Sequence, residues 1–192
     1  MRDPSKVDQT AISRLKQGDL NGLEILVNRY QVQAVHVAYL ILYDRQSAED
    51  IVQSAFIKVA QRINQFDDQR PFAPWFFRII LNDARKLAEK QVRDVSFNAQ
   101  ADKSAAKLAR LLTDPNPGPE DQVEEMEIRE TILEAIQSLP PGQRSVIVMR
   151  YFLDMNMAEM SNATERPLST IKWWLRDARS RLRRLMRTAQ NG

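Results

Sequence analysis

The C-terminal stretch of the chain carries cations at a density that suits binding to a polyanion. Between Arg166 and Arg187 there are eight basic residues against one acid, Asp177. From Asp114 to Glu134 the balance is reversed, with eight acids against one base. Guanidinium and ammonium groups bind phosphates through charge-assisted hydrogen bonds. Nucleic acid is therefore one reading of the basic stretch, and a solvated basic helix face is the other.

Residues for catalysis or metal binding are scarce by comparison. The chain has no cysteine and one histidine, His36, so disulfides, thiolate sites and histidine acid–base chemistry lack their usual groups. His36 lies among apolar residues in AVHVAY, which favours a structural role. With no glycine-rich phosphate loop either, we expect no enzymatic activity, no metal site and no cofactor.

The elements that carry these residues are predicted to be helices. Glycine is absent between Gly22 and Gly118, and Pro71 and Pro74 are the only prolines from residue 23 to residue 114. Apolar residues recur at helical spacing, and no alternating run long enough to indicate a sheet is present. The predicted fold class is all-α.

Four helices are predicted in the first half, over roughly 9–17, 20–43 with a possible break near Tyr30, 48–64 and 74–91. Ser47 followed by Asp50 is a capping-box signal for the third of these helices. Its predicted buried face consists of Ile51, Val52, Ala55, Phe56, Val59 and Ile63. Of the aromatic set that follows, we expect at least three to be buried: Phe66, Phe72, Trp75, Phe76 and Phe77.

A polar stretch over about 92–122 separates the two halves of the chain. It contains DPNPGPED, in which prolines and a glycine break any helix. We therefore expect two small helical domains, 1–91 and 123–192, joined by a flexible linker.

The second domain is predicted to contain a helix-turn-helix. Its helices are expected over roughly 124–138, 141–153, 157–163 and 168–187. A short helix followed by a tight connection and a long basic helix is the pattern of this motif, in which the second helix enters the major groove. One apolar stripe of the last helix is predicted to be buried, with arginines beside it: Ile171, Leu175, Ala178, Leu182 and Leu185.

Two sequence strings resemble a known family in its own order and separation. AEDIVQSAFIKVAQRINQF, followed by PFAPWFFRIILNDARK, resembles the second conserved region of the extracytoplasmic-function sigma factors. ILEAIQSLPPGQRSVIVMRYFLDMNMAEM, continued by STIKWWLRDARSRLRRL, resembles their fourth region. The resemblance extends from residue 20 to residue 187.

The resemblance implies a DNA-binding subunit that gives core RNA polymerase its promoter recognition. The first domain would bind the polymerase and open the −10 promoter element, and the second would read the −35 element. The residues implied for polymerase binding are Asp50, Gln53 and Ser54. Those implied for the −10 element are Asn64, Phe66, Asp68, Arg70, Trp75, Arg78 and Asn82. Those implied for the −35 element are Arg166, Ser169, Thr170, Lys172, Trp173, Arg176 and Arg179.

Two departures from the family pattern lie in the helix-turn-helix. Glu165 and Pro167 stand where the family usually has a glycine in the turn and a serine at the start of the recognition helix. Trp173 and Trp174 stand where small or basic residues are usual. For Trp174 packing is the favoured role. For Trp173 the alternatives are a groove contact and an anchor on which the first domain or an inhibitor closes. The anchor is the favoured role, because burial at a protein interface uses a tryptophan more fully than a groove contact does.

The implied partners are core RNA polymerase, promoter DNA and an anti-sigma factor. The N-terminus lacks a signal-peptide core, and the longest apolar run, Val37–Tyr43, is too short to span a membrane, so we expect a cytoplasmic protein. The main alternative is a helix-turn-helix regulator that acts without polymerase. A second alternative, an adaptor whose basic helix docks an acidic protein, explains the charge separation but not the paired strings.

Overall fold

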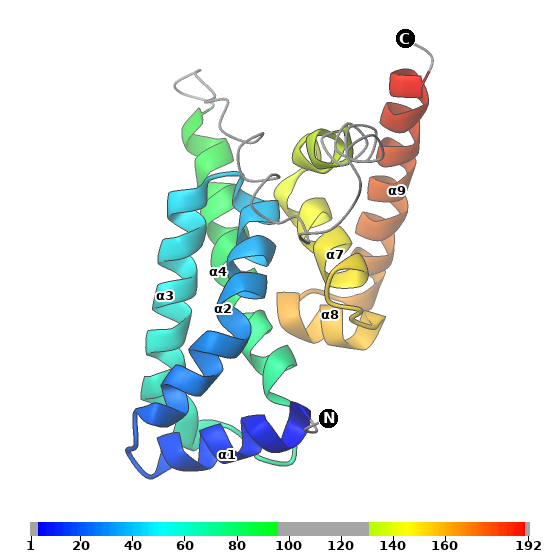
Figure 1. Cartoon of the computed structure of the whole chain (residues 1–192). Coiled ribbons are helices and arrows are strands. Elements are labelled where there is room, and N and C mark those ends of the chain that lie inside the picture. The colour runs from blue at the N-terminus through cyan, green and yellow to red at the C-terminus, as the bar shows by residue number, and fades with distance from the viewer. Residues whose placement is uncertain (1–3, 96–130, 191–192) are drawn as a thin grey trace, which may run out of the picture.

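Every element that the structure describes is a helix, as predicted. The computed structural model describes residues 4–95 and 131–190, and side chains within 6–94 and 131–187. Two groups of helices lie side by side, α1 to α4 in one and α7 to α9 in the other (Figure 1). None of the described helices is long and apolar enough to cross a membrane.

The first group consists of four helices and a short 3-10 turn. Their bounds are α1 Pro4–Lys16, α2 Asn21–Leu42, α3 Arg45–Arg62, η1 Ile63–Gln65 and α4 Phe72–Val95. Helices α2, α3 and α4 run alongside one another, and α1 crosses one end of them (Figure 1). The predicted linker and acidic stretch lie outside the described residues, except for the last residues of α4 and the helical residues 131–137.

Several helix boundaries differ from the predictions. Helix α1 begins at Pro4 and not near residue 9, and α4 extends over Phe72–Val95 and not over 74–91. Helix α2 continues through Tyr30 without a break. The predicted cap of α3 at Ser47 is wrong: Asp44 has an extended backbone, and its carboxylate accepts the Ser47 amide at 2.9 Å. Ser47 therefore lies inside the first turn, where its amide needs the partner that Asp44 supplies.

Aromatic and aliphatic side chains fill the centre of the first group. All six residues predicted to form the inner face of α3 are buried. Four of the five aromatic residues singled out from the sequence are also buried, and Trp75 is half-buried. Tyr30 packs its ring on Phe72 and Phe76 and donates its hydroxyl to Asp8 at 2.6 Å. Burial raises the pKa of Tyr30 to about 12, so this hydroxyl stays a donor.

The second group forms the predicted helix-turn-helix. Residues 131–137 are helical and are followed by α7 Pro141–Tyr151, α8 Met157–Thr164 and α9 Leu168–Gln190. A capping box begins α8, since the Asn156 side chain accepts the Glu159 amide at 3.0 Å while Glu159 accepts the Asn156 amide at 2.7 Å. Both residues are in the sequence at the spacing of this motif.

The apolar stripe of α9 is buried over its first half only. Ile171, Leu175 and Ala178 are buried against α7 and α8, as predicted, and Leu182 is half-buried. Leu185 is 41% exposed, which contradicts the prediction. The spacing of the stripe is regular, but α9 extends past the helices that cover its beginning.

The two groups share one continuous core. Contacts join α2 to α7 and α4 to both α7 and α8. His36 of α2 places its ring edge against Phe152 with 5.6 Å between ring centroids, and burial lowers the pKa of the histidine. The structure therefore shows a closed arrangement in which the helix-turn-helix packs against the first group.

Candidate nucleic-acid interface

One exposed stripe of α9 carries four of the seven residues predicted to meet the −35 element. Ser169, Lys172, Trp173 and Arg176 are all exposed, at spacings of three, one and three residues that keep them on one side of the helix. Thr170 beside them is half-buried. The opposite side holds the buried apolar residues, so packing fixes which side of α9 faces outward.

Two charged residues near this stripe are held by α7. Arg179 donates from Nε to the Tyr151 hydroxyl at 3.0 Å and lies over that ring. Asp177, the single acid of the basic stretch, accepts from Gln143 at 2.7 Å and from Arg181 at 2.9 Å. The hydrogen bond from Gln143 is the largest cause that lowers the pKa of Asp177. This carboxylate thus ties α9 to α7 and leaves the outward stripe without an acid.

The two tryptophans have different environments. Trp174 is half-buried against Gly142, and a methyl group added to that glycine would lie 2.8 Å from the indole ring. Packing, the role favoured for Trp174 from the sequence, is thus what the structure shows. Trp173 remains 52% exposed although the two groups are closed on each other. The idea that the first domain closes on Trp173 is therefore wrong for this arrangement.

The turn between α8 and α9 has the left-handed backbone for which glycine is usual. Glu165 ends α8 with φ 55°, and its amide bonds back to the Ser161 carbonyl. The Ser161 hydroxyl in turn donates to the Arg166 carbonyl at 2.6 Å. These hydrogen bonds keep the turn tight with a glutamate in the glycine position, and Pro167 follows just before the first residue of α9.

The loop between η1 and α4 is pinned from α1. Lys16 donates to the Phe66 carbonyl and to Asp68, both at 2.9 Å. Arg70 pairs with Asp67 at 3.2 Å, and Asn64 and Arg70 are exposed. Phe66, by contrast, is only 4% exposed and packs on Trp75, so its prediction as a DNA contact is corrected to support of the loop.

One side of α4 presents the other residues predicted for the −10 element. Trp75, Arg78 and Asn82 are spaced by three and four residues and share that side. Arg78 is exposed, whereas Trp75 and Asn82 are half-buried. Trp75 therefore offers the exposed part of a ring that packs on Phe66 and Phe72, and Arg78 offers a positive charge.

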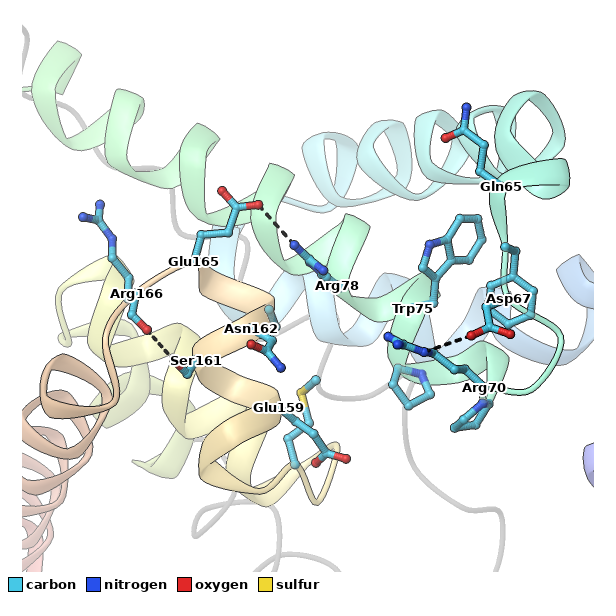
Figure 2. Close-up of a pocket in the computed structure, with 15 residues that line it drawn as sticks. Gln65, Asp67, Arg70, Trp75, Arg78, Glu159, Ser161, Asn162, Glu165 and Arg166 are labelled. Carbon is cyan, nitrogen blue, oxygen red and sulfur yellow. Dashed lines mark hydrogen bonds and ion pairs between the residues drawn. The ribbon is translucent and has the colours of Figure 1, made fainter.

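A cleft of about 750 Å³ lies between this side of α4 and the helix-turn-helix. Trp75, Arg70 and Arg78 line it from the first group, and Asn162 and Arg166 line it from the second. Figure 2 shows Glu165 of the second group pointing at Arg78, and the carboxylate and guanidinium are 3.2 Å apart. The closed arrangement thus brings the predicted −10 residues next to the turn of the helix-turn-helix.

The predicted polymerase-binding residues form an exposed strip on α3. Asp50, Gln53 and Ser54 are all exposed. Ile57 continues the strip and is 52% exposed. Ile57 was not predicted as a contact residue, although an apolar residue spaced four and seven from exposed polar ones is a signal of a contact surface.

The described residues contain no cluster of histidine, aspartate and glutamate that could hold a metal ion. What the geometry offers instead is cations, an aromatic edge and hydrogen-bonding side chains on two separate helix faces. Groups of these types are suited to binding the phosphates and bases of a nucleic acid.

Two models of known protein families match this chain, one over each group of helices. The model described as Sigma-70 region 2 matches residues 26–94, and the one described as Sigma-70, region 4 matches residues 129–182. Together they cover more than half of the 192 residues. The chain belongs to the sigma-70 family of RNA polymerase subunits.

Curated relatives narrow the family to one group. The chain is 29% identical to the ECF RNA polymerase sigma factor SigW of Bacillus subtilis, over 92% of this chain and 95% of the relative. It is 30% identical to the RNA polymerase sigma factor NccH of Alcaligenes xylosoxydans xylosoxydans, over 99% and 100%. It is an extracytoplasmic-function sigma factor, which binds core RNA polymerase and directs promoter recognition and transcription initiation. Sigma factors are non-catalytic regulators of transcription.

Solved structures show the same fold. CnrH in complex with the cytosolic domain of CnrY matches with a TM-score of 0.65 at 21% identity, over 95% of this chain and 98% of that one. The sigma factor RpoE in complex with the anti-sigma factor NepR from Bartonella quintana matches with a TM-score of 0.63 at 18% identity, over 84% and 96%. At these identities the likeness concerns the fold alone.

Proposed function

We propose that the two halves of the chain divide the promoter between them. Residues 1–91 bind core polymerase and open the −10 element, residues 123–192 read the −35 element, and residues 92–122 link them. The observation that carries this division is the pair of exposed polar faces, one on α4 within the region 2 match and one on α9 within the region 4 match. Two faces on separate helix groups suit two separate DNA elements.

At the −10 element, the first half supplies a loop and one side of α4. Asn64, Asp68 and Arg70 are the exposed loop residues for an unpaired base, with Asp68 held in place by Lys16. Arg78 and Asn82 lie along the melted DNA strand, and the half-buried Trp75 offers the exposed part of its ring for stacking. Base stacking on such a ring contributes about 1–3 kcal/mol.

Energetics make polymerase a necessary partner for this opening step. Unstacking five or six base-pair steps costs roughly 7–8 kcal/mol at about 1.4 kcal/mol per step. Stacking two captured bases returns about 2–6 kcal/mol. The chain alone falls short, so the grip of core polymerase on DNA supplies the remainder.

At the −35 element, α9 enters the major groove. Ser169 and Thr170 lie near base edges at its N-terminal end, while Lys172, Arg176 and Arg166 contact phosphates. Arg179 adds a phosphate contact while resting on Tyr151. Trp173, exposed in the middle of the stripe, contacts thymine methyl groups, the apolar feature of the major groove.

A protein inhibitor of the anti-sigma class is the further partner that we propose. The two solved relatives were each seen with a partner protein, the cytosolic domain of CnrY in one and the anti-sigma factor NepR in the other. This sigma factor would work, and be held, in the cytoplasm.

Substitutions on α3 test whether its exposed strip binds core polymerase. Asp50→Ala combined with Gln53→Ala should weaken binding to bacterial core polymerase about fivefold or more, the 1 kcal/mol that marks a significant interface residue. Gln33→Ala, exposed on α2, is the matched control and should bind like the wild type. Equal binding by the double variant and the control, with both folded, would place the polymerase contact elsewhere.

A further inference from the structure

In the closed arrangement, the helix-turn-helix lies over the side of α4 that is proposed to face DNA. The cleft between α4 and the helix-turn-helix has about 750 Å³, the size of a small-molecule pocket and too little for a duplex. Arg78 and Trp75 from one side and Arg166 from the other line this space. As long as the groups stay closed, Arg70, Trp75 and Arg78 of the −10 surface proposed above face the helix-turn-helix across this cleft, and promoter DNA cannot enter between them.

One ion pair crosses the cleft, and it involves Arg78, a residue proposed above to contact DNA. The Arg78 guanidinium lies 3.2 Å from the Glu165 carboxylate, and no other carboxylate among the described residues is paired with Arg78. A carboxylate offers this guanidinium two anionic oxygens, as a DNA phosphate does. Arg78 thus already holds an anion that resembles its proposed ligand.

Glu165 occupies its position at a conformational cost. Its φ of 55° is in the left-handed region, which glycine adopts freely and a glutamate does not. Glycine would make the turn without strain, but it would bring no charge to Arg78. The side chain is otherwise exposed and makes no other ion pair among the described residues.

A second joint holds the groups together without ion pairs. Arg144 of α7 is buried and donates to the Ile41 carbonyl of α2 as well as to two carbonyls of its own group, those of Gln137 and Leu139. It also lies 4.9 Å above the ring of Tyr43, whose hydroxyl donates to the Leu133 carbonyl at 2.9 Å. All these acceptors are neutral, so salt acts much less on this joint than on the exposed Arg78–Glu165 pair.

We propose that Glu165 is an inhibitory carboxylate that keeps Arg78 from promoter DNA while the sigma factor is free. The neutral joint around Arg144 sets the geometry of the closed state, and the ion pair biases the equilibrium toward it. Separation of the two groups on core polymerase then releases Arg78 to the −10 strand. The inference rests on the proposed contact between Arg78 and DNA.

Because both partners are exposed, the effect of the pair is modest and measurable. An exposed ion pair changes an equilibrium by roughly two- to fivefold. The absence of cysteine allows two labels to be attached at Gln61→Cys on α3 and Ser180→Cys on α9, both exposed. Energy transfer between the labels then reports the ratio of closed to open full-length chain.

Glu165→Gln should lower the closed-to-open ratio by about two- to fivefold at low salt, and the difference from wild type should disappear at high salt. Asp154→Asn is the matched control, because Asp154 is also an exposed acid with a left-handed backbone, φ 49°, in the same group. It should leave the ratio unchanged. In an Arg78→Ala background, Glu165→Gln should have no further effect.

Three results would overturn the proposal: an unchanged ratio with Glu165→Gln at low salt, an equal shift with Asp154→Asn, or an undiminished effect of Glu165→Gln in the Arg78→Ala background. The measurement uses neither polymerase nor DNA. A failure of the proposed promoter contacts would appear separately, as normal −10 opening by holoenzyme that carries Arg78→Ala.

Discussion

At the scale of single residues, position 142 has no room for a side chain larger than that of glycine, because Trp174 packs directly on it. Gly142→Ala places a methyl group 2.8 Å from the Trp174 ring, and overpacking of this kind costs about 1–3 kcal/mol. We expect the free energy of unfolding in urea to fall by that amount. In a Trp174→Phe background the smaller ring leaves room, so the same substitution should cost clearly less. An unchanged cost there would mean that the indole is not what the methyl group meets.

His36 gives the stability of the closed chain a defined pH dependence. Burial lowers the pKa of this histidine below its ordinary value of 6.5, so the unfolded chain takes up the proton more readily than the folded chain. Stability from this group is fully present above pH 6.5 and falls as the pH drops from there toward the lowered pKa. The free energy of unfolding should be measured at pH 7.5 and 5.5, about one unit on either side of 6.5. It should be lower at pH 5.5 in the wild type, and the difference should be smaller in His36→Gln. Equal losses would assign the pH effect to other groups.

Residue types predicted some of these environments and not others. Trp174 lies directly before the buried Leu175 and three residues after the buried Ile171, so its packing was predictable from spacing. Phe66 was not, because a phenylalanine at a helix end has the same sequence appearance whether its ring points into a core or toward a base. Its burial depends on Trp75 and Phe72, which reach it only after the chain has folded back.

At the scale of elements, the exposed cations of α9 predict how the affinity for DNA depends on salt concentration. Arg176→Ala in the holoenzyme should reduce the slope of log affinity against log salt by about 0.9 for DNA carrying the −35 element, because one phosphate contact is lost. Arg181→Ala removes the same charge from the same helix, but its guanidinium is held by Asp177 at 2.9 Å. It should leave the slope nearly unchanged. If Arg176→Ala lowers the slope no more than Arg181→Ala does, Arg176 makes no phosphate contact and the stripe is a solvent-exposed face.

The helices themselves were largely predictable, whereas their ends were not. Helical spacing and the scarcity of glycine and proline predicted α2, α3, α4 and α9. The start of α3 was misplaced because Asp44 and Ser47 are both good caps by type, and the backbone at Asp44 decides between them. The outer half of α9 keeps its apolar spacing beyond the reach of α7 and α8, so its pattern overstated the burial of Leu185.

At the scale of the whole molecule, the joint between the helix groups escaped prediction entirely. Arg144 follows a helix start in PPGQRS and has the sequence appearance of a surface cation. Its burial depends on a carbonyl 103 residues away, at the end of α2. Local sequence patterns contain no information about such a long-range contact. The function was predictable because the family resemblance extends over most of the chain.

Run-off transcription measures whether this chain directs core RNA polymerase to promoters. Purified chain is combined with bacterial core polymerase and fragmented genomic DNA of the source, and transcript 5′ ends are mapped. We predict discrete start sites that require the chain, each preceded by shared −10 and −35 elements, and no stable opening of the same DNA by the chain without polymerase. Start sites identical with and without the chain, or site-specific DNA binding that persists unaided and gives no transcript, would contradict the account.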